Sequence, residues 1–108
     1  MAPTEDLVFR ALADGGRRRL LDQLYARNGR TLGDLCSRME MSRQAVSKHL
    51  AILERAGLVT VHWRGREKLH YLNPVPIHEI HARWIAKYER HRLDALHDLK
   101  TELEGEKR

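Results

Sequence analysis

The 108-residue sequence predicts a mainly α-helical fold with one small β-hairpin. Apolar residues recur at intervals of three and four along most of the chain, which is the spacing of one helix face. Residues 58–73 instead alternate apolar with polar residues, as half-buried strands do. Residue types that begin and end helices, such as Thr31, Ser42 and Gly57, separate these segments. We therefore expect four helices, a hairpin and a last helix, in that order.

Two helices are expected before residue 30. The first covers residues 5–13, and the second covers residues 16–28 with Asp14 as its N-terminal cap. Asn28 and Gly29 are typical of a helix end. The residues expected to face the core are Leu7, Val8, Ala11, Leu12, Leu20, Leu21, Leu24 and Tyr25.

Residues 31–57 predict two short helices joined by a tight turn. Thr31 with Asp34 three residues later suits the start of the first helix. Ser42 suits the start of the second helix, and Gly57 suits its end. The expected core-facing residues are Leu32, Leu35, Met39, Val46, Leu50 and Leu53. This pattern is the sequence form of a helix-turn-helix, whose second helix enters the major groove of DNA.

The exposed face of that second helix carries residue types that recognise DNA bases. Arginine can pair with guanine, and glutamine with adenine, through two hydrogen bonds each. Residues near the start of the helix reach deepest into the groove. The expected DNA contacts are Ser42, Arg43, Gln44, Ser47 and Lys48. The alternative is that these residues form the ordinary solvated face of an amphipathic helix.

The alternating segment that follows predicts a β-hairpin. Its tip is the turn Arg64-Gly65-Arg66-Glu67, in which glycine tolerates the backbone conformation that a tight turn needs. A hairpin directly behind a recognition helix is the wing of a winged helix. We expect Arg64 and Arg66 to bind phosphates or the minor groove of DNA. The alternative is that these two arginines only keep the turn soluble.

The net charge of the chain and its distribution favour a nucleic-acid partner. The chain has 20 Lys and Arg against 15 Asp and Glu, for a net charge of +5. The excess lies in residues 10–30 and 42–68, around the helix-turn-helix, which is typical of a duplex binder. We expect no membrane partner, because no apolar run approaches the length of a membrane span and the N-terminus is unlike a signal peptide. The single cysteine, Cys36, excludes an internal disulfide and suits a reducing cytoplasm.

A last helix is expected from Pro76 to about Glu104. Its length of about 42 Å exceeds what so small a domain can cover, so its apolar stripe would stay exposed in a monomer. We therefore expect a homodimer, whose two recognition helices read the two halves of a palindrome. The expected interface residues are Leu7, Val8, Leu12, Ile80, Trp84, Tyr88, Leu96 and Leu99. The alternative is a last helix that folds back on its own core.

The element order and the segments 11–14, 17–21, 42–50, 53–59 and 65–72 together resemble the ArsR family of bacterial winged-helix transcriptional repressors. The resemblance covers about residues 5–103, so we expect residues 1–108 to form one such domain with residues 76–104 as its dimerisation helix. It implies a cytoplasmic, nucleoid-associated homodimer that binds a double-stranded operator, often that of its own gene, and blocks transcription until a signal releases it. It also assigns the DNA contacts to the recognition helix and the wing tip. The sequence identifies neither the operator nor the inducer.

Metal-sensing members of that family carry a cysteine box where this chain has Thr31 and Gly33, and Cys36 alone remains nearby. One thiol cannot assemble a soft-metal site, so we expect Cys36 to pack as a small apolar group, with a redox role as the alternative. Other members bind metal between their paired last helices. This chain has a similar set of acids and histidines in its last helix, but its two histidines are one residue closer together than in the metal-binding members. One residue turns a side chain by about 100° around a helix. That set is Glu79, His81, His91 and Asp94. We expect no metal and no cofactor, with a metal- or redox-responsive sensor as the alternative.

An enzyme is not expected. Ser47, Lys48 and His49 include nucleophile and base types, but consecutive helical residues point about 100° apart and cannot share a proton. A winged-helix module that binds protein or RNA is the remaining alternative. Single-stranded RNA binders display aromatic platforms, whereas the aromatic residues here are expected to be buried, which favours duplex DNA. Those residues are Trp63, Tyr71, Trp84 and Tyr88.

Overall fold

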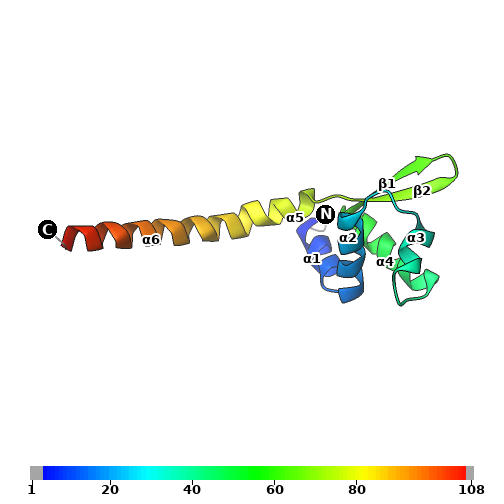
Figure 1. Ribbon diagram of the computed structural model, residues 1–108, viewed down its shortest axis with the longest axis horizontal. Coiled ribbons are helices and arrows are strands. Elements are labelled where there is room, and N and C mark those ends of the chain that lie inside the picture. The colour runs from blue at the N-terminus through cyan, green and yellow to red at the C-terminus, as the bar shows by residue number, and fades with distance from the viewer. Residues whose placement is uncertain (1–3, 107–108) are drawn as a thin grey trace. The chain divides into compact units, whose positions relative to one another are not determined.

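A computed structural model describes residues 4–106 and has the predicted order of elements (Figure 1). The first helices are α1 (Thr4–Leu12), α2 (Gly15–Ala26), α3 (Leu32–Ser37) and α4 (Arg43–Arg55). The hairpin strands are β1 (Val59–Arg64) and β2 (Glu67–Leu72), followed by α5 (Val75–Ile80), a π-helical turn η1 (His81–Ile85) and α6 (Ala86–Glu106). Contacts divide these residues into two units, one ending at Ile77 and one beginning at His78, and each is described by itself.

Three helix caps predicted from the sequence are confirmed, at Asp14, Thr31 and Ser42. Asp14 Oδ1 accepts the backbone N–H of Arg17 at 3.1 Å at the start of α2. Thr31 Oγ1 accepts the N–H of Asp34 at 3.2 Å, and Ser42 Oγ accepts that of Ala45 at 3.1 Å. Each side chain thereby satisfies an N–H that the first helical turn leaves without a partner.

Helix α4 ends in a hydrogen-bonded pair of turns around Gly57. The N–H of Gly57 donates to Glu54 O and the N–H of Leu58 donates to Leu53 O, both at 3.0 Å. This is the Schellman arrangement, which places its central residue in the left-handed region. Gly57 has a φ of 79°, so glycine fits where an L side chain would be strained.

The core lies among helices α1 to α4 and the base of the hairpin. It contains most of the predicted apolar residues, but Tyr25 is 82% exposed, so its predicted burial is wrong. The buried apolar residues are Val8, Ala11, Leu20, Leu21, Leu24, Leu35, Met39, Val46, Leu50, Leu53, Ala56, Leu58, Val59 and Leu69.

The hairpin is anchored at its base and free at its tip. Strands β1 and β2 are antiparallel, with Trp63 opposite Lys68. At the base, the buried His70 exchanges backbone hydrogen bonds with Arg30, and His70 Nδ1 lies 2.9 Å from the Arg30 carbonyl oxygen. Along β1 the exposure rises from 2% at Val59 to 62% at Trp63. The predicted burial of Trp63 is therefore wrong, because the outer half of the hairpin extends beyond the helices (Figure 1).

The second unit is helical throughout its described part, from His78 to Glu106. The π-helical turn η1 was not predicted. Trp84 is 56% exposed and Tyr88 is 71% exposed, so neither is buried within the single chain. Leu93, Leu96, Leu99 and Leu103 are exposed as well. Among residues 4–106, no helix combines the length and apolar character that crossing a membrane requires.

Candidate nucleic-acid interface

The recognition helix α4 has one face in the core and the other in solvent. Val46, Leu50 and Leu53 hold it against the helices beneath. The five sequence-predicted contact residues lie at its start and along its outer face, and all five are exposed. They are Ser42, Arg43, Gln44, Ser47 and Lys48. The spacing of three and four that buries one face thus leaves the polar residues of the other face available to a partner.

A polar cluster fixes α4 relative to the start of α2. Arg17 Nη1 lies 3.3 Å from His49 Nδ1, while Arg17 Nε donates to Ala11 O at 2.8 Å. Arg17 therefore joins the end of α1 to the inner side of α4. Gly16 is buried beside this cluster, and a side chain there would collide with Met41. The recognition helix is held both by apolar packing and by this arginine.

Asp14 completes the cluster. Its Oδ1 lies 4.0 Å from His49 Nδ1. The hydrogen bond from the Arg17 backbone lowers the pKa of the Asp14 carboxyl below its ordinary value, and the nearby Arg17 charge acts in the same direction. The carboxylate is thus ionised at neutral pH, which suits its position at the positive end of α2.

The wing tip presents two guanidinium groups. Arg64 Nη2 pairs with Glu67 Oε2 at 3.3 Å, but the Arg64 side chain is still 75% exposed. Gly65 has a φ of 62° with open space around it, and Arg66 follows it on the exposed turn. Both arginines are therefore open to an external anion.

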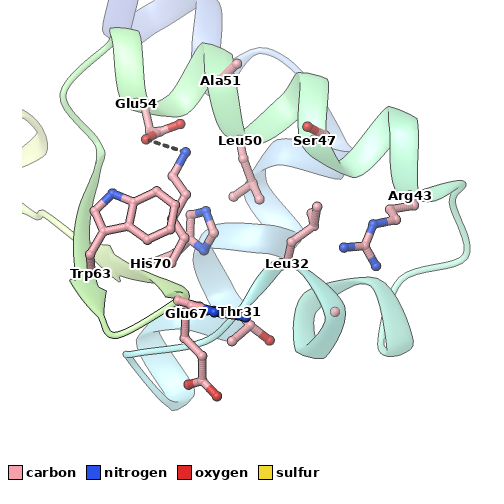
Figure 2. A pocket seen from close by; sticks show the side chains of 13 residues that line it. Thr31, Leu32, Arg43, Ser47, Leu50, Ala51, Glu54, Trp63, Glu67 and His70 are labelled. Atoms are coloured by element: carbon pink, nitrogen blue, oxygen red, sulfur yellow. Dashed lines mark ion pairs between the residues drawn. The ribbon is translucent and has the colours of Figure 1, made fainter.

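An open groove of about 560 Å³ separates the wing from α4. Lys68 Nζ on β2 and Glu54 Oε1 on α4 form an ion pair across it at 3.6 Å. Figure 2 shows the Trp63 indole inside the groove, beneath that ion pair. The groove is lined by Thr31, Leu32, Gly33, Arg43, Ser47, Leu50, Ala51, Glu54, Trp63, Arg66, Glu67, Lys68 and His70.

Sequence reasoning missed Trp63 and Lys68 as parts of this surface. The signal was present, because cross-strand partners in a hairpin share a face and the turn sequence fixes the register. The missing information was which face the core covers. Since Trp63 is exposed, burial of the aromatic residues no longer argues against RNA.

The other candidate sites are placed as follows. Ser47 and Lys48 point to solvent while His49 faces Arg17, so the three do not converge. Cys36 is a free, partly buried thiol. Within the described part of this single chain, no group of three or more His, Cys, Asp or Glu side chains is placed to hold a metal ion. His81, His91, Glu79 and Asp94 are all exposed.

The residues expected at a dimer interface differ in exposure. Trp84, Tyr88, Leu96 and Leu99 are exposed by half or more. Leu7, Leu12 and Ile80 are half-buried. Val8 is only 1% exposed and belongs to the core of its own chain, so it offers no surface to a partner.

Comparisons with known proteins point to one family. A family described as a helix-turn-helix domain matches residues 12–62. The uncharacterized HTH-type transcriptional regulator YuzN of Bacillus subtilis is 38% identical over an alignment of 91 residues that covers 79% of this chain and 99% of YuzN. The transcriptional repressor SdpR of the same organism is 35% identical over 66 residues, or 61% of this chain and 72% of SdpR.

Solved structures agree. The ArsR family transcriptional regulator RHA00566 is similar with a TM-score of 0.71 and 28% identity, covering 82% of this chain and 94% of that one. An ArsR-like transcriptional regulator from Rhodococcus sp. RHA1 has a TM-score of 0.69 and 32% identity, covering 86% and 89%. The likeness extends beyond the helix-turn-helix to most of the chain.

Proposed function

The chain belongs to the ArsR family of winged helix-turn-helix, DNA-binding transcriptional regulators, and we propose that it acts as a homodimeric repressor at a palindromic operator. The observation that carries the proposal is the joint exposure of the recognition face of α4 and the arginine tip of the wing on either side of one groove. A repressor among the similar proteins, SdpR, supports the direction of regulation. We propose a cytoplasmic, nucleoid-associated location, since a bacterial regulator of this family meets its operator there.

We assign the base contacts to the start of α4. Arg43 and Gln44 stand in its first turn, where side chains reach deepest into the major groove. Ser42, Ser47 and Lys48 flank them and suit phosphates or base edges. Arg64 and Arg66 supply the contacts of the wing, in or beside the minor groove.

We assign dimerisation to the exposed apolar stripe of the second unit, with Leu7 and Leu12 of α1 as further candidates. Large apolar side chains that stay exposed along one helix mark an interface. The proposed stripe is Trp84, Tyr88, Leu96 and Leu99, which are exposed, together with the half-buried Ile80. Two copies joined there carry two recognition helices, which a two-fold symmetric operator matches.

The test is a gel-shift assay with duplex DNA from upstream of the chain's own gene. We expect retention that falls steeply as salt rises, because Lys and Arg release counterions from the phosphates they neutralise. Arg43→Ala and Gln44→Ala are expected to reduce the preference for this fragment over a scrambled duplex by about 10- to 100-fold. Equal retention of both duplexes by the unaltered protein overturns the operator-specific proposal. Stronger retention of single-stranded RNA than of duplex would favour an RNA-binding function instead.

A further inference from the structure

We propose that the groove between α4 and the wing holds one sugar-phosphate strand of the duplex, and that the Trp63 indole packs against a deoxyribose of that strand. The proposal rests on the DNA-binding function above and adds contacts to it. It assigns a role to Trp63 and Lys68, which neither the recognition face nor the wing tip includes.

The first argument is position. A helix in the major groove and a wing tip at the adjacent minor groove are separated by the phosphate strand between the two grooves of B-DNA. The space between α4 and the wing is therefore where that strand passes. This space is the open groove that Arg43 and Ser47 of α4 line on one side and Trp63 of the wing lines on the other (Figure 2). Arg66 of the wing tip also lines it.

The second argument is charge. Arg43, Arg66 and Lys68 bring three positive charges to the groove lining, against the two carboxylates of Glu54 and Glu67. Each carboxylate is already engaged, Glu54 with Lys68 at 3.6 Å and Glu67 with Arg64 at 3.3 Å. The Lys68 side chain is still 42% exposed, so its ammonium can meet a phosphate while staying near Glu54. Three positive charges against two negative ones leave a net charge of +1 on the lining, which favours an anion over a neutral ligand.

The third argument is the exposed indole. Trp63 is 62% exposed on β1 and is opposite Lys68 in the hairpin register. The indole has an apolar face and a single N–H donor. A deoxyribose ring offers an apolar face and the adjoining phosphate offers acceptor oxygens, so one strand segment satisfies both parts of the side chain.

Fluorescence tests the contact directly with a 30-base-pair duplex of mixed sequence at low salt, since a backbone contact does not depend on base sequence. The chain has two tryptophans, Trp63 and Trp84. We expect the duplex to change the fluorescence of the unaltered protein and to leave that of Trp63→Phe nearly unchanged. An equal response in the two proteins overturns the proposal.

The affinity of each variant for duplex DNA, and how that affinity changes with salt, distinguish an apolar contact from a charged one. Trp63→Ala is expected to weaken binding about tenfold without altering the slope of log affinity against log salt. Lys68→Ala is expected to reduce that slope by about one. The matched control is Tyr25→Ala, which removes an aromatic residue that is 82% exposed on α2, outside the groove. Trp63→Phe is expected to recover most of the lost affinity.

The outcomes distinguish this proposal from the function on which it rests. If the unaltered protein retains duplex but Trp63→Ala binds as Tyr25→Ala does, the strand does not contact the indole and the proposal fails alone. If Trp63→Ala also reduces the salt slope, Trp63 acts by positioning the wing cations, and the deoxyribose contact is wrong. If the unaltered protein retains no duplex, the proposed function fails and this contact fails with it.

Discussion

Ser42 caps α4 and is also one of the proposed DNA contacts. Its Oγ accepts the N–H of Ala45 at 3.1 Å, which begins α4 at the point where base contacts are expected. Removing such a cap costs about 1 kcal/mol. We expect Ser42→Ala to lower the free energy of unfolding by this amount, as measured by urea denaturation. Ser47→Ala changes the same residue type at an exposed position farther along the helix and should stay within about 0.5 kcal/mol. Equal stability of the two variants would show that the cap does not define the start of α4.

Asp14 gives a pH-dependent prediction. The Arg17 N–H holds the pKa of Asp14 below its ordinary value of 3.8, so the folded chain favours the carboxylate more than the unfolded chain does. The resulting stabilisation is complete above the ordinary pKa and is lost as the pH falls through the lowered value. Asp14→Asn keeps a cap oxygen but removes the charge. We expect a lower urea midpoint for Asp14→Asn at neutral pH, with the gap to the unaltered protein narrowing below about pH 4. A gap that stays constant into the acid range contradicts this account.

Helix caps depend on local sequence and could be predicted, whereas the exposure of Trp63 depends on the rest of the fold and could not. A cap such as Thr31 depends on residues three positions apart, so a few neighbours in the sequence decide it. Burial depends on what covers a residue from elsewhere in the fold. The alternation along β1 indicates a strand correctly, but it does not say where the core ends beneath that strand. Tyr25 shows the same limit on a helix, since it follows the buried Leu24 yet faces solvent.

At the scale of the element, the end of α4 sets where the wing begins. Leu58 turns back to bond Leu53 O because Gly57 adopts a φ of 79°. A side chain in that conformation costs about 1–2 kcal/mol. We expect Gly57→Ala to lower the free energy of unfolding by about this amount. Gly33→Ala is the control, since Gly33 lies within α3 with its nearest neighbour at 3.8 Å and alanine favours helix. Thermal denaturation of both variants checks this, and equal loss would mean that strain at Gly57 is not the cause.

The type and order of the helices and strands could be predicted because the periodicity of apolar residues is strong. Where each element ends depends on contacts with distant residues, which periodicity does not describe. The predicted second helix extended to Asn28, but α2 ends at Ala26, and the Asn28 side chain instead accepts the N–H of Leu72 at 2.7 Å. The π-helical turn η1 lies within the predicted last helix. A single wider turn inside a long helix has no residue-type signature of its own, so helical periodicity did not predict it.

At the scale of the whole molecule, the apolar stripe of the second unit is exposed in the single chain. Leu96 is 54% exposed and Leu99 is 51% exposed in the single chain. Exposed apolar side chains that line up in this way usually mark an interaction surface, and the partner proposed here is a second copy of the chain. The recognition face and the groove can be located within one chain, whereas the role proposed for the stripe requires a second copy. Its role was therefore predicted from the length of the helix, and no contact within the single chain tests it.

Assembly is tested by adding one charge to either side of α6. Leu96→Glu places a carboxylate in the stripe, whereas Thr101→Glu adds the same charge on the opposite face of the helix, about 140° away. We expect Leu96→Glu to shift the chain to the mass of a monomer in sedimentation equilibrium, and Thr101→Glu to remain a dimer. Because two linked recognition helices share one binding event, loss of the dimer should weaken operator binding by about 100-fold or more. If both variants stay dimeric and bind equally well, the copies are joined elsewhere, and the half-site spacing expected for a symmetric operator must be reconsidered with them.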